Sequence, residues 1–202
     1  MTAMDLVVFA WRLVQLPSVR DHHGYFRHDH LEFEQTAGRE EWRSSVNEIL
    51  ARNGVALRQE PDGRVLRVGT ASAAAVTSRA LPPSGDATLD DKIVVALRRY
   101  HDADPAVRRE ALEAIWDAFE RVKSILDPAD KKRSVERLIA EMASDAPTQS
   151  ALDQEFRDLT RIGNDFQIRH LEVAKHPVPD GVVDLWFVRA LSIVETAVRA
   201  IT

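Results

Sequence analysis

An arginine and a histidine late in the chain have residue types suited to acid–base chemistry at a phosphodiester. Arg169 is followed directly by His170, and His176 comes seven positions after Arg169. Histidine titrates near neutral pH and can take or give a proton, whereas arginine keeps its proton and binds phosphate through two N–H groups. If the phosphodiester is that of RNA, the substrate supplies the nucleophile, its 2′-hydroxyl, and the protein must supply only the proton transfer and the charge stabilisation. We therefore assign His176 to proton transfer and Arg169 to the stabilisation of charge on the phosphate.

The element expected to position these residues is an amphipathic helix over residues 148–174, ended by Pro177 and Pro179. At about 100° per residue, one face collects alternating acids and bases: Asp158, Arg161, Asp165, Arg169, Glu172 and His176. The opposite face supplies core residues: Leu152, Phe156, Leu159, Phe166 and Val173. The charged face has two interpretations, a solvated ladder of weak ion pairs or a functional site.

The stretch Arg169-His170-Leu-Glu-Val-Ala-Lys-His176 resembles the Arg-x(4–6)-His pattern of the HEPN family. The longer string from Asn164 to Glu172 is similar to HEPN-type proteins of bacterial abortive-infection systems, and the resemblance covers roughly the C-terminal half of the chain. It implies a helical-bundle domain that dimerises and, in its active members, cuts RNA without a metal or other cofactor. Products with a 2′,3′-cyclic phosphate and a 5′-hydroxyl should follow.

The resemblance also implies how one Arg–His pair per chain suffices. A two-fold dimer brings two pairs into one cleft, since each helix meets its own copy at a symmetric interface. Further residues of the same stretch are candidates for supporting or substrate-binding roles, through hydrogen bonds or positive charge toward an RNA backbone: His170, Asn164, Glu172, Arg161 and Lys175. Each has an alternative interpretation as a solvated surface group.

Two functions from different classes follow. The first is a metal-independent endoribonuclease, a toxin or phage-defence effector that acts on RNA as a homodimer, with an antitoxin or sensor protein as a further partner. The second is a noncatalytic HEPN-like module that dimerises or binds a nucleotide or a protein. The carboxylates of Asp165 and Glu172 favour the second if they face the substrate, because they would repel RNA.

A third alternative rests on four histidines near the N-terminus: His22, His23, His28 and His30. Imidazole and carboxylate groups are zinc ligands, so a metal-dependent hydrolase is conceivable here. The spacing matches no zinc module, however, and the sequence supplies no thiolate. We expect a polar surface loop over residues 19–30 and no metal.

Composition bounds the remaining possibilities. The chain has 202 residues, of which 45% are hydrophobic and 29% charged, enough for one large or two small domains. The lack of cysteine excludes a disulfide framework and thiol catalysis and fits a reducing cytoplasm. No apolar run reaches the ~20 residues of a membrane span. The formal net charge of −5 argues against nonspecific coating of nucleic acid.

Periodicity and turn signals predict a mainly α protein in two parts. Residues 1–70 form a module of two helices, over 4–16 and 39–52, and a β-hairpin turning at Asp62-Gly63. Residues 71–88, rich in alanine, serine and proline, read as a linker with room for a short helix over 72–79. Residues 89–202 are expected to form an antiparallel helical bundle, with helices over 90–101, 105–126, 131–142, 148–174 and 182–201.

Periodicity also predicts which residues face the core. In the 39–52 helix they are Trp42, Val46, Ile49 and Leu50; in the 105–126 helix Ala111, Leu112, Ile115, Trp116, Phe119 and Val122; in the 182–201 helix Leu185, Trp186, Val188, Leu191 and Val194. Asp117, Glu120 and Lys123 lie on the polar side of the 105–126 helix, where we expect surface pairing.

Overall fold

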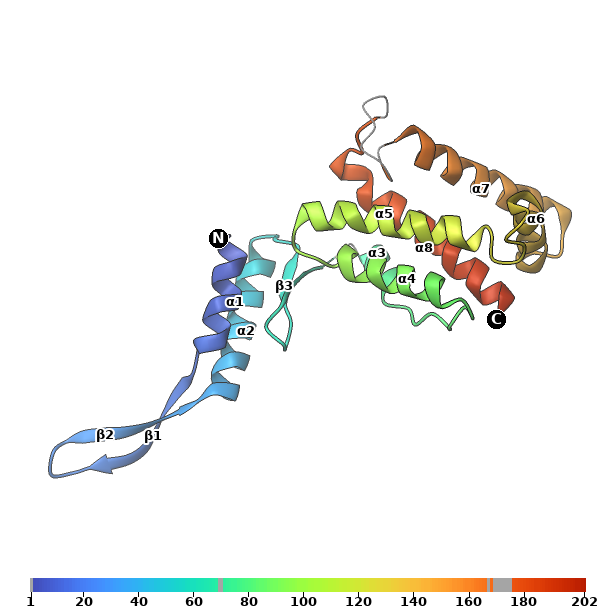
Figure 1. Cartoon of the computed structure of the whole chain (residues 1–202). Coiled ribbons are helices and arrows are strands. Elements are labelled where there is room, and N and C mark those ends of the chain that lie inside the picture. Colours follow the sequence, from blue (N-terminus) through green and yellow to red (C-terminus); the bar gives the residue numbers. More distant parts are fainter. Residues whose placement is uncertain (1, 69–70, 167, 169–175) are drawn as a thin grey trace. The chain divides into compact units, whose positions relative to one another are not determined.

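A computed structural model of the chain describes residues 2–68, 71–166, 168 and 176–202, and the predicted mainly α fold is confirmed. The chain divides into two compact units, Met1–Val68 and Gly69–Thr202 (Figure 1). Within the described residues, no helix is both long enough and apolar enough to cross a membrane. The two units are taken in turn.

The first unit contains α1 (Ala3–Leu13), β1 (Leu16–His23), β2 (His28–Glu34), α2 (Gln35–Arg52), β3 (Leu57–Gln59) and β4 (Val65–Arg67). Thr2 and Asp5 form a capping box that starts α1. Helix α2 ends at Asn53, followed by Gly54 in the left-handed region with φ 65°. The hairpin predicted around Asp62-Gly63 is confirmed as β3 and β4, with Gly63 at φ 87°.

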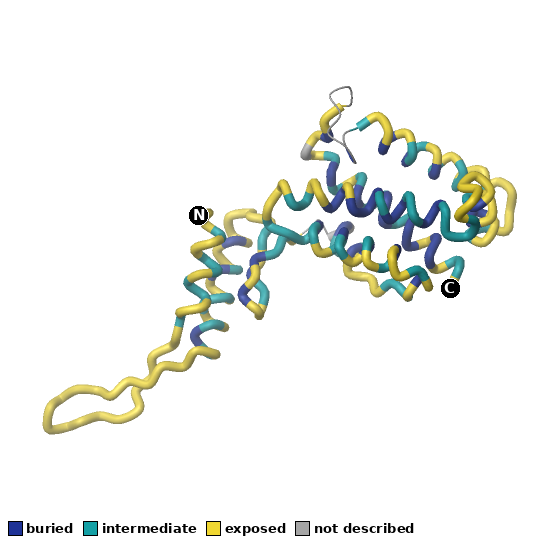
Figure 2. The backbone as a smooth tube through the Cα atoms, in the orientation of Figure 1, coloured by how far each residue is buried: buried dark blue, intermediate teal, exposed yellow. Residues whose placement is uncertain are grey.

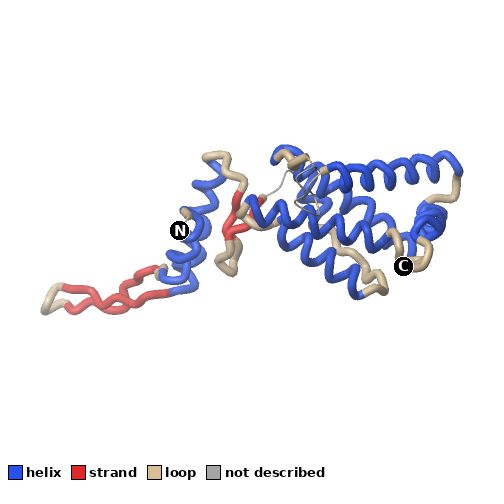
Figure 3. Tube along the Cα trace, turned by 45° about the horizontal axis from the view of Figure 1, so that its top comes forward, coloured by secondary structure: helices blue, strands red, loops and turns tan. Residues whose placement is uncertain are grey.

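The polar loop predicted over residues 19–30 is wrong. Strands β1 and β2 pair antiparallel from Leu16↔Glu34 to His23↔His28, with a register shift between Val19 and Asp21 (Figure 3). The first helix accordingly ends at Leu13 rather than at residue 16, because Leu16 already belongs to the strand. Every residue of both strands is exposed. Because neither face of this hairpin is buried, the sequence, with its four histidines, resembles that of a polar loop.

Close backbone contacts hold the first unit together. A Cβ added to Gly38 of α2 would lie 2.6 Å from the backbone nitrogen of Leu16, so glycine permits this approach. The guanidinium of Arg39 lies 4.2 Å from the centroid of the Trp11 ring and its Nε donates to the Trp11 carbonyl at 3.2 Å. Val46 and Leu50 are buried as predicted, whereas Ile49, predicted on the same apolar face, is 51% exposed.

The second unit contains α3 (Ala71–Thr77), α4 (Ala87–Tyr100), α5 (Pro105–Val122), α6 (Lys131–Met142), α7 (Ala146–Asp165) and α8 (Asp180–Ile201). Four of these helices begin with an aspartate whose side chain accepts a hydrogen bond from a first-turn amide: Asp86, Asp104, Asp130 and Asp145. The segment predicted as a linker contains α3, which packs against α8.

Helix α5 lies at the centre of this unit and carries the predicted core (Figure 2). Its buried apolar face packs against α4 and α8, and Tyr100 stacks on Phe187 with ring centroids 4.1 Å apart. Leu191 and Val194 of α8 are buried as expected, but Leu185, also predicted to face the core, is 61% exposed. Helices α6 and α7, which precede α8 in the chain, line the candidate site together with the end of α5.

Candidate functional site

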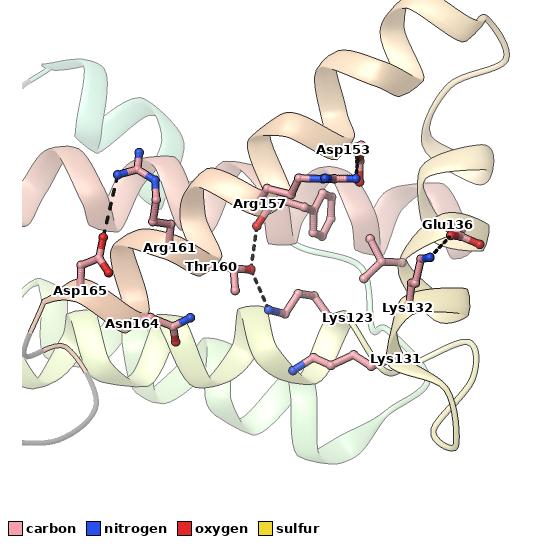
Figure 4. Close-up of a pocket in the computed structure, with 12 residues that line it drawn as sticks. Lys123, Lys131, Lys132, Glu136, Asp153, Arg157, Thr160, Arg161, Asn164 and Asp165 are labelled. Carbon is pink, nitrogen blue, oxygen red and sulfur yellow. Dashed lines mark hydrogen bonds and ion pairs between the residues drawn. The ribbon is translucent and has the colours of Figure 1, made fainter.

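A groove of about 740 Å³ opens between the end of α5, the start of α6 and one face of α7 (Figure 4). Two apolar residues, Val135 and Phe156, contribute to its walls. The rest of its lining is polar or charged: Lys123, Lys131, Lys132, Glu136, Asp153, Arg157, Thr160, Arg161, Asn164 and Asp165. The lining contains five cationic side chains and three carboxylates, and two of the cations, Lys123 and Lys131, pair with Glu120, which is not among the lining residues.

Lys123, which follows the last turn of α5, is the buried member of this set, with 5% of the residue exposed. Its ammonium group donates to Thr160 Oγ1 of α7 at 2.9 Å and lies 2.6 Å from Glu120 Oε1 and 4.7 Å from the Phe119 ring centroid. A buried ammonium group is tolerated only with such partners, because desolvation penalises the charged form. Lys123 thereby joins α5 to α7 in the groove.

Glu120 completes this polar cluster by binding two lysines, Lys123 and Lys131. Burial raises the pKa of Glu120, but hydrogen bonds from both lysines outweigh it, so the pKa lies below its ordinary value. The carboxylate is therefore ionised at neutral pH. We predicted Glu120 and Lys123 as a surface pair; the pair forms, but Lys123 is not at the surface.

The remaining groove cations pair with carboxylates on their own helices. Arg157 lies 2.8 Å from Asp153, and Lys132 lies 3.9 Å from Glu136. Pairs of this kind contribute about 0–1 kcal/mol when exposed, and both cations are largely exposed. An anionic ligand could therefore compete for them at small cost.

The predicted charged face is confirmed only over the first part of its length. Arg161 lies 3.4 Å from Asp158 and 3.9 Å from Asp165, as spacings of three and four residues on a helix require. Helix α7 then ends at Asp165, with Phe166 in extended backbone. The predicted helix to residue 174 is thus wrong, because Phe166 leaves the helix and its ring packs edge-on against Trp186, with centroids 4.6 Å apart.

His176 does not lie on the helix. Its backbone amide donates to the Asp165 carbonyl at 3.1 Å, and residues 166 and 176 form an isolated parallel β-bridge. The rings of Phe166 and His176 lie 5.9 Å apart, and His176 is exposed. The backbone of His176 therefore lies at the end of α7, next to Asp165, which lines the groove, while its ring lies near Phe166.

The other predicted site residues fall into two groups. Arg161 and Asn164 are exposed on α7 and line the groove. Four lie outside the described residues: Arg169, His170, Glu172 and Lys175. Three further cations line the groove that were not predicted: Lys131, Lys132 and Arg157. The basic start of the 131–142 helix was a signal for the two lysines, whereas Arg157 had none beyond its place four residues from Arg161 on the 148–174 helix.

The histidines of the first unit form a separate cluster on the β1–β2 hairpin. His23 and His28 stack with ring centroids 5.5 Å apart, and His30 lies 5.0 Å from His28. His22 instead contacts Asp29, with Nδ1 and Oδ1 2.6 Å apart. Among the described residues, no group of three or more potential ligands is arranged to hold a metal ion.

Comparison of the chain with family models, with curated proteins and with solved structures finds no match in any of the three.

Proposed function

We propose that the chain is a metal-independent endoribonuclease of HEPN type that acts as a dimer, with Arg169 binding the scissile phosphate and His176 transferring the proton. The observation that carries the proposal is the position of His176. Its backbone amide donates to the Asp165 carbonyl at the end of α7 at 3.1 Å, its side chain is exposed, and Asp165 is one of the residues that line the cation-bearing groove.

The groove supports the binding of an RNA backbone. Phosphate contacts fix register without reading sequence, and lysine and arginine side chains make most of them. Lys132 and Arg157 are largely exposed and only weakly paired, so phosphates can replace their carboxylate partners. Asn164 adds an amide that can donate to a phosphate or a 2′-hydroxyl.

The chemistry needs no group beyond side chains and substrate. An imidazole takes the proton of the 2′-hydroxyl, which attacks the adjacent phosphorus. The 5′-oxygen leaves with a proton from a second imidazole, supplied by the partner copy in a two-fold dimer. An arginine stabilises the charge on the phosphorane. The strand ends are then a 2′,3′-cyclic phosphate and a 5′-hydroxyl.

A second function, a noncatalytic helical module that binds a protein or a nucleotide, is favoured by one specific observation. Arg161 lies between Asp158 and Asp165 at 3.4 and 3.9 Å, and Arg157 and Lys132 also have carboxylate partners. Such pairing lowers the positive potential available to RNA.

The deciding experiment is cleavage of a broad RNA pool by the full chain in EDTA, with product ends mapped. We expect cleavage that leaves 2′,3′-cyclic phosphate ends, and a loss of at least about 100-fold in His176→Ala, the usual contribution of a proton-transferring side chain. His101→Ala is the matched control, because His101 lies in the same unit but at the C-terminal end of α4, not at the end of α7. A folded chain that leaves all RNA intact, or equal rates for the two variants, would replace the ribonuclease by the binding module.

A further inference from the structure

Among the described residues, no strand pairs with the outer edge of β2. Strands β1 and β2 form a two-stranded sheet of their own, and every residue in both is exposed. Both strands extend away from α1 and α2, which Figure 2 shows as an exposed stretch. A two-stranded ribbon is only marginally stable in water, and its free edge carries backbone N–H and C=O groups available to another strand.

The sequence of β2 is complementary to itself when a second copy runs antiparallel to it. The strand reads His28-Asp29-His30-Leu31-Glu32-Phe33-Glu34. With Leu31 opposite Leu31 of the copy, His28 lies opposite Glu34 and His30 lies opposite Glu32. An imidazole N–H can donate to a carboxylate whether the ring is neutral or protonated, so each even-numbered position meets a hydrogen-bonding partner of the other kind.

Neighbouring registers lack this property. In an antiparallel ladder, two directly opposite residues either both point their N–H and C=O groups at each other or both point them away. A symmetric pair of β2 strands must therefore have one residue opposite its own copy, and the alternatives to Leu31 at this central position are its neighbours in the strand. Centring on Glu32 opposes two carboxylates, and like charges directly opposite each other destabilise a sheet. Centring on His30 opposes two imidazoles instead of an imidazole and a carboxylate, and it leaves Glu34 beyond the end of the paired strand. The register centred on Leu31 avoids both.

We propose that β2 pairs with β2 of a second copy of this chain, antiparallel and centred on Leu31, to form a four-stranded sheet across a two-fold axis. This interface is independent of the proposed ribonuclease activity. Such a sheet satisfies the free edge of both copies with main-chain hydrogen bonds, while the His–Glu pairs fix its register.

The His–Glu pairs lie on one face of the sheet, and the same pairing brings apolar side chains together on the opposite face. Cross-strand partners share a face, so Pro17 and Phe33 lie on one side with Val19 and Leu31. Val19, Leu31 and Phe33 are 60%, 52% and 57% exposed, and the two copies of Leu31 meet at the axis. The least complementary pair is Asp29 opposite Phe33, but Asp29 keeps its contact with His22 at 2.6 Å.

A cysteine crosslink tests the register directly, because the chain contains no cysteine. Opposed residues of antiparallel strands have Cα atoms about 4.5–5.5 Å apart, inside the range of a disulfide. We expect Leu31→Cys to give a covalent dimer of the full chain under mild oxidation. Val19→Cys is the matched control: it is on the same face and similarly exposed, but two copies of β1 would be three strand spacings apart, about 14 Å.

Equal crosslinking of Leu31→Cys and Val19→Cys, or crosslinking of neither, would overturn the proposal. A shifted register is also distinguished, since diagonal partners lie about 7–8 Å apart and Leu31→Cys would then crosslink no faster than the control.

Charge exchange provides a second test, read by sedimentation of the parent and variants. His28→Glu with His30→Glu opposes carboxylates at every even position and should raise the dissociation constant of the dimer at least about tenfold. Glu32→Lys with Glu34→Lys should restore a heterodimer when mixed with that variant. A monomeric parent, or a double variant that dimerises like the parent, overturns the hairpin interface. In the latter case a dimer formed through the helical unit, as the proposed ribonuclease requires, would still stand.

Discussion

At the scale of single residues, the close contact between α7 and α5 in the helical unit depends on a glycine, Gly163. A Cβ added to Gly163 of α7 would overlap the indole ring of Trp116 in α5. Trp116 is 1% exposed and sits among the largest buried side chains, so it has no free space into which to move. Glycine usually weakens a helix interior by about 1 kcal/mol. Here it allows α7 to lie against the core and carry the groove residues.

We expect Gly163→Ala to lower the free energy of unfolding by about 1–3 kcal/mol, the usual cost of overpacking a core, despite the gain in helix propensity. Urea unfolding followed by tryptophan fluorescence measures it. Gly181→Ala in α8 is the matched control, because nothing lies within 4 Å of its added Cβ. That variant should be unchanged or slightly more stable. A Gly163→Ala chain as stable as Gly181→Ala would show that the α5–α7 contact is looser than described.

At the scale of elements, one carboxylate both starts α4 and ties it to α5. Asp86 accepts a hydrogen bond from the Leu89 amide at 2.8 Å and binds the guanidinium of Arg121. The Arg121 hydrogen bond, followed by that from Leu89, lowers the pKa of Asp86 below its ordinary value of 3.8. The ionised form is therefore the one that the folded state stabilises.

The stability that Asp86 contributes should consequently depend on pH in one direction. A carboxylate with a lowered folded pKa contributes fully above its unfolded pKa of about 3.8 and loses the contribution as pH falls through the lower folded value. We expect Asp86→Asn, which keeps a capping side chain, to cost about 1 kcal/mol at pH 7. The difference from the parent should shrink as pH falls below 3.8.

Urea unfolding of parent and Asp86→Asn across this pH range makes the comparison. Asp145→Asn is a suitable reference, since Asp145 caps α7 and the hydrogen bond from the Thr148 amide lowers its pKa. A pH-dependent difference no larger for Asp86→Asn than for Asp145→Asn would mean that Asp86 acts through its cap alone.

At the scale of the whole molecule, the chain contains two units, each with its own buried residues. Val46, Leu50 and Val65 are buried in the first, and the α5 face and its neighbours are buried in the second. Each unit also contains two tryptophans, Trp11 and Trp42 in the first and Trp116 and Trp186 in the second. Unfolding can therefore be followed in each.

We expect two calorimetric transitions that respond to different substitutions. Gly63→Ala should lower only the transition of the first unit, because Gly63 has φ 87° and its added Cβ would overlap the Trp11 ring. Gly163→Ala should lower only that of the second. A single transition shifted by both substitutions would show that the units unfold as one cooperative structure.

The sequence by itself determined most of the helices and one hairpin, because their signals act between residues close in the chain. The 131–142 helix has the predicted bounds, the core face of α5 is buried as expected, and Asp-Gly marks the β3–β4 turn. Capping and periodicity act over three or four residues, so no tertiary information was needed there.

Tertiary structure alone decided the shape of the candidate site. The end of α7 depends on Phe166 packing against Trp186, twenty residues later, and on the return of His176 to Asp165. The burial of Lys123 depends on Thr160, 37 positions away. The exposed β1–β2 hairpin buries no face, and its apolar alternation is limited to a few residues such as Leu31 and Phe33 beside four histidines. The contacts that decide the site, Phe166–Trp186, His176–Asp165 and Lys123–Thr160, join residues that are ten or more positions apart, beyond the reach of helix periodicity and capping signals.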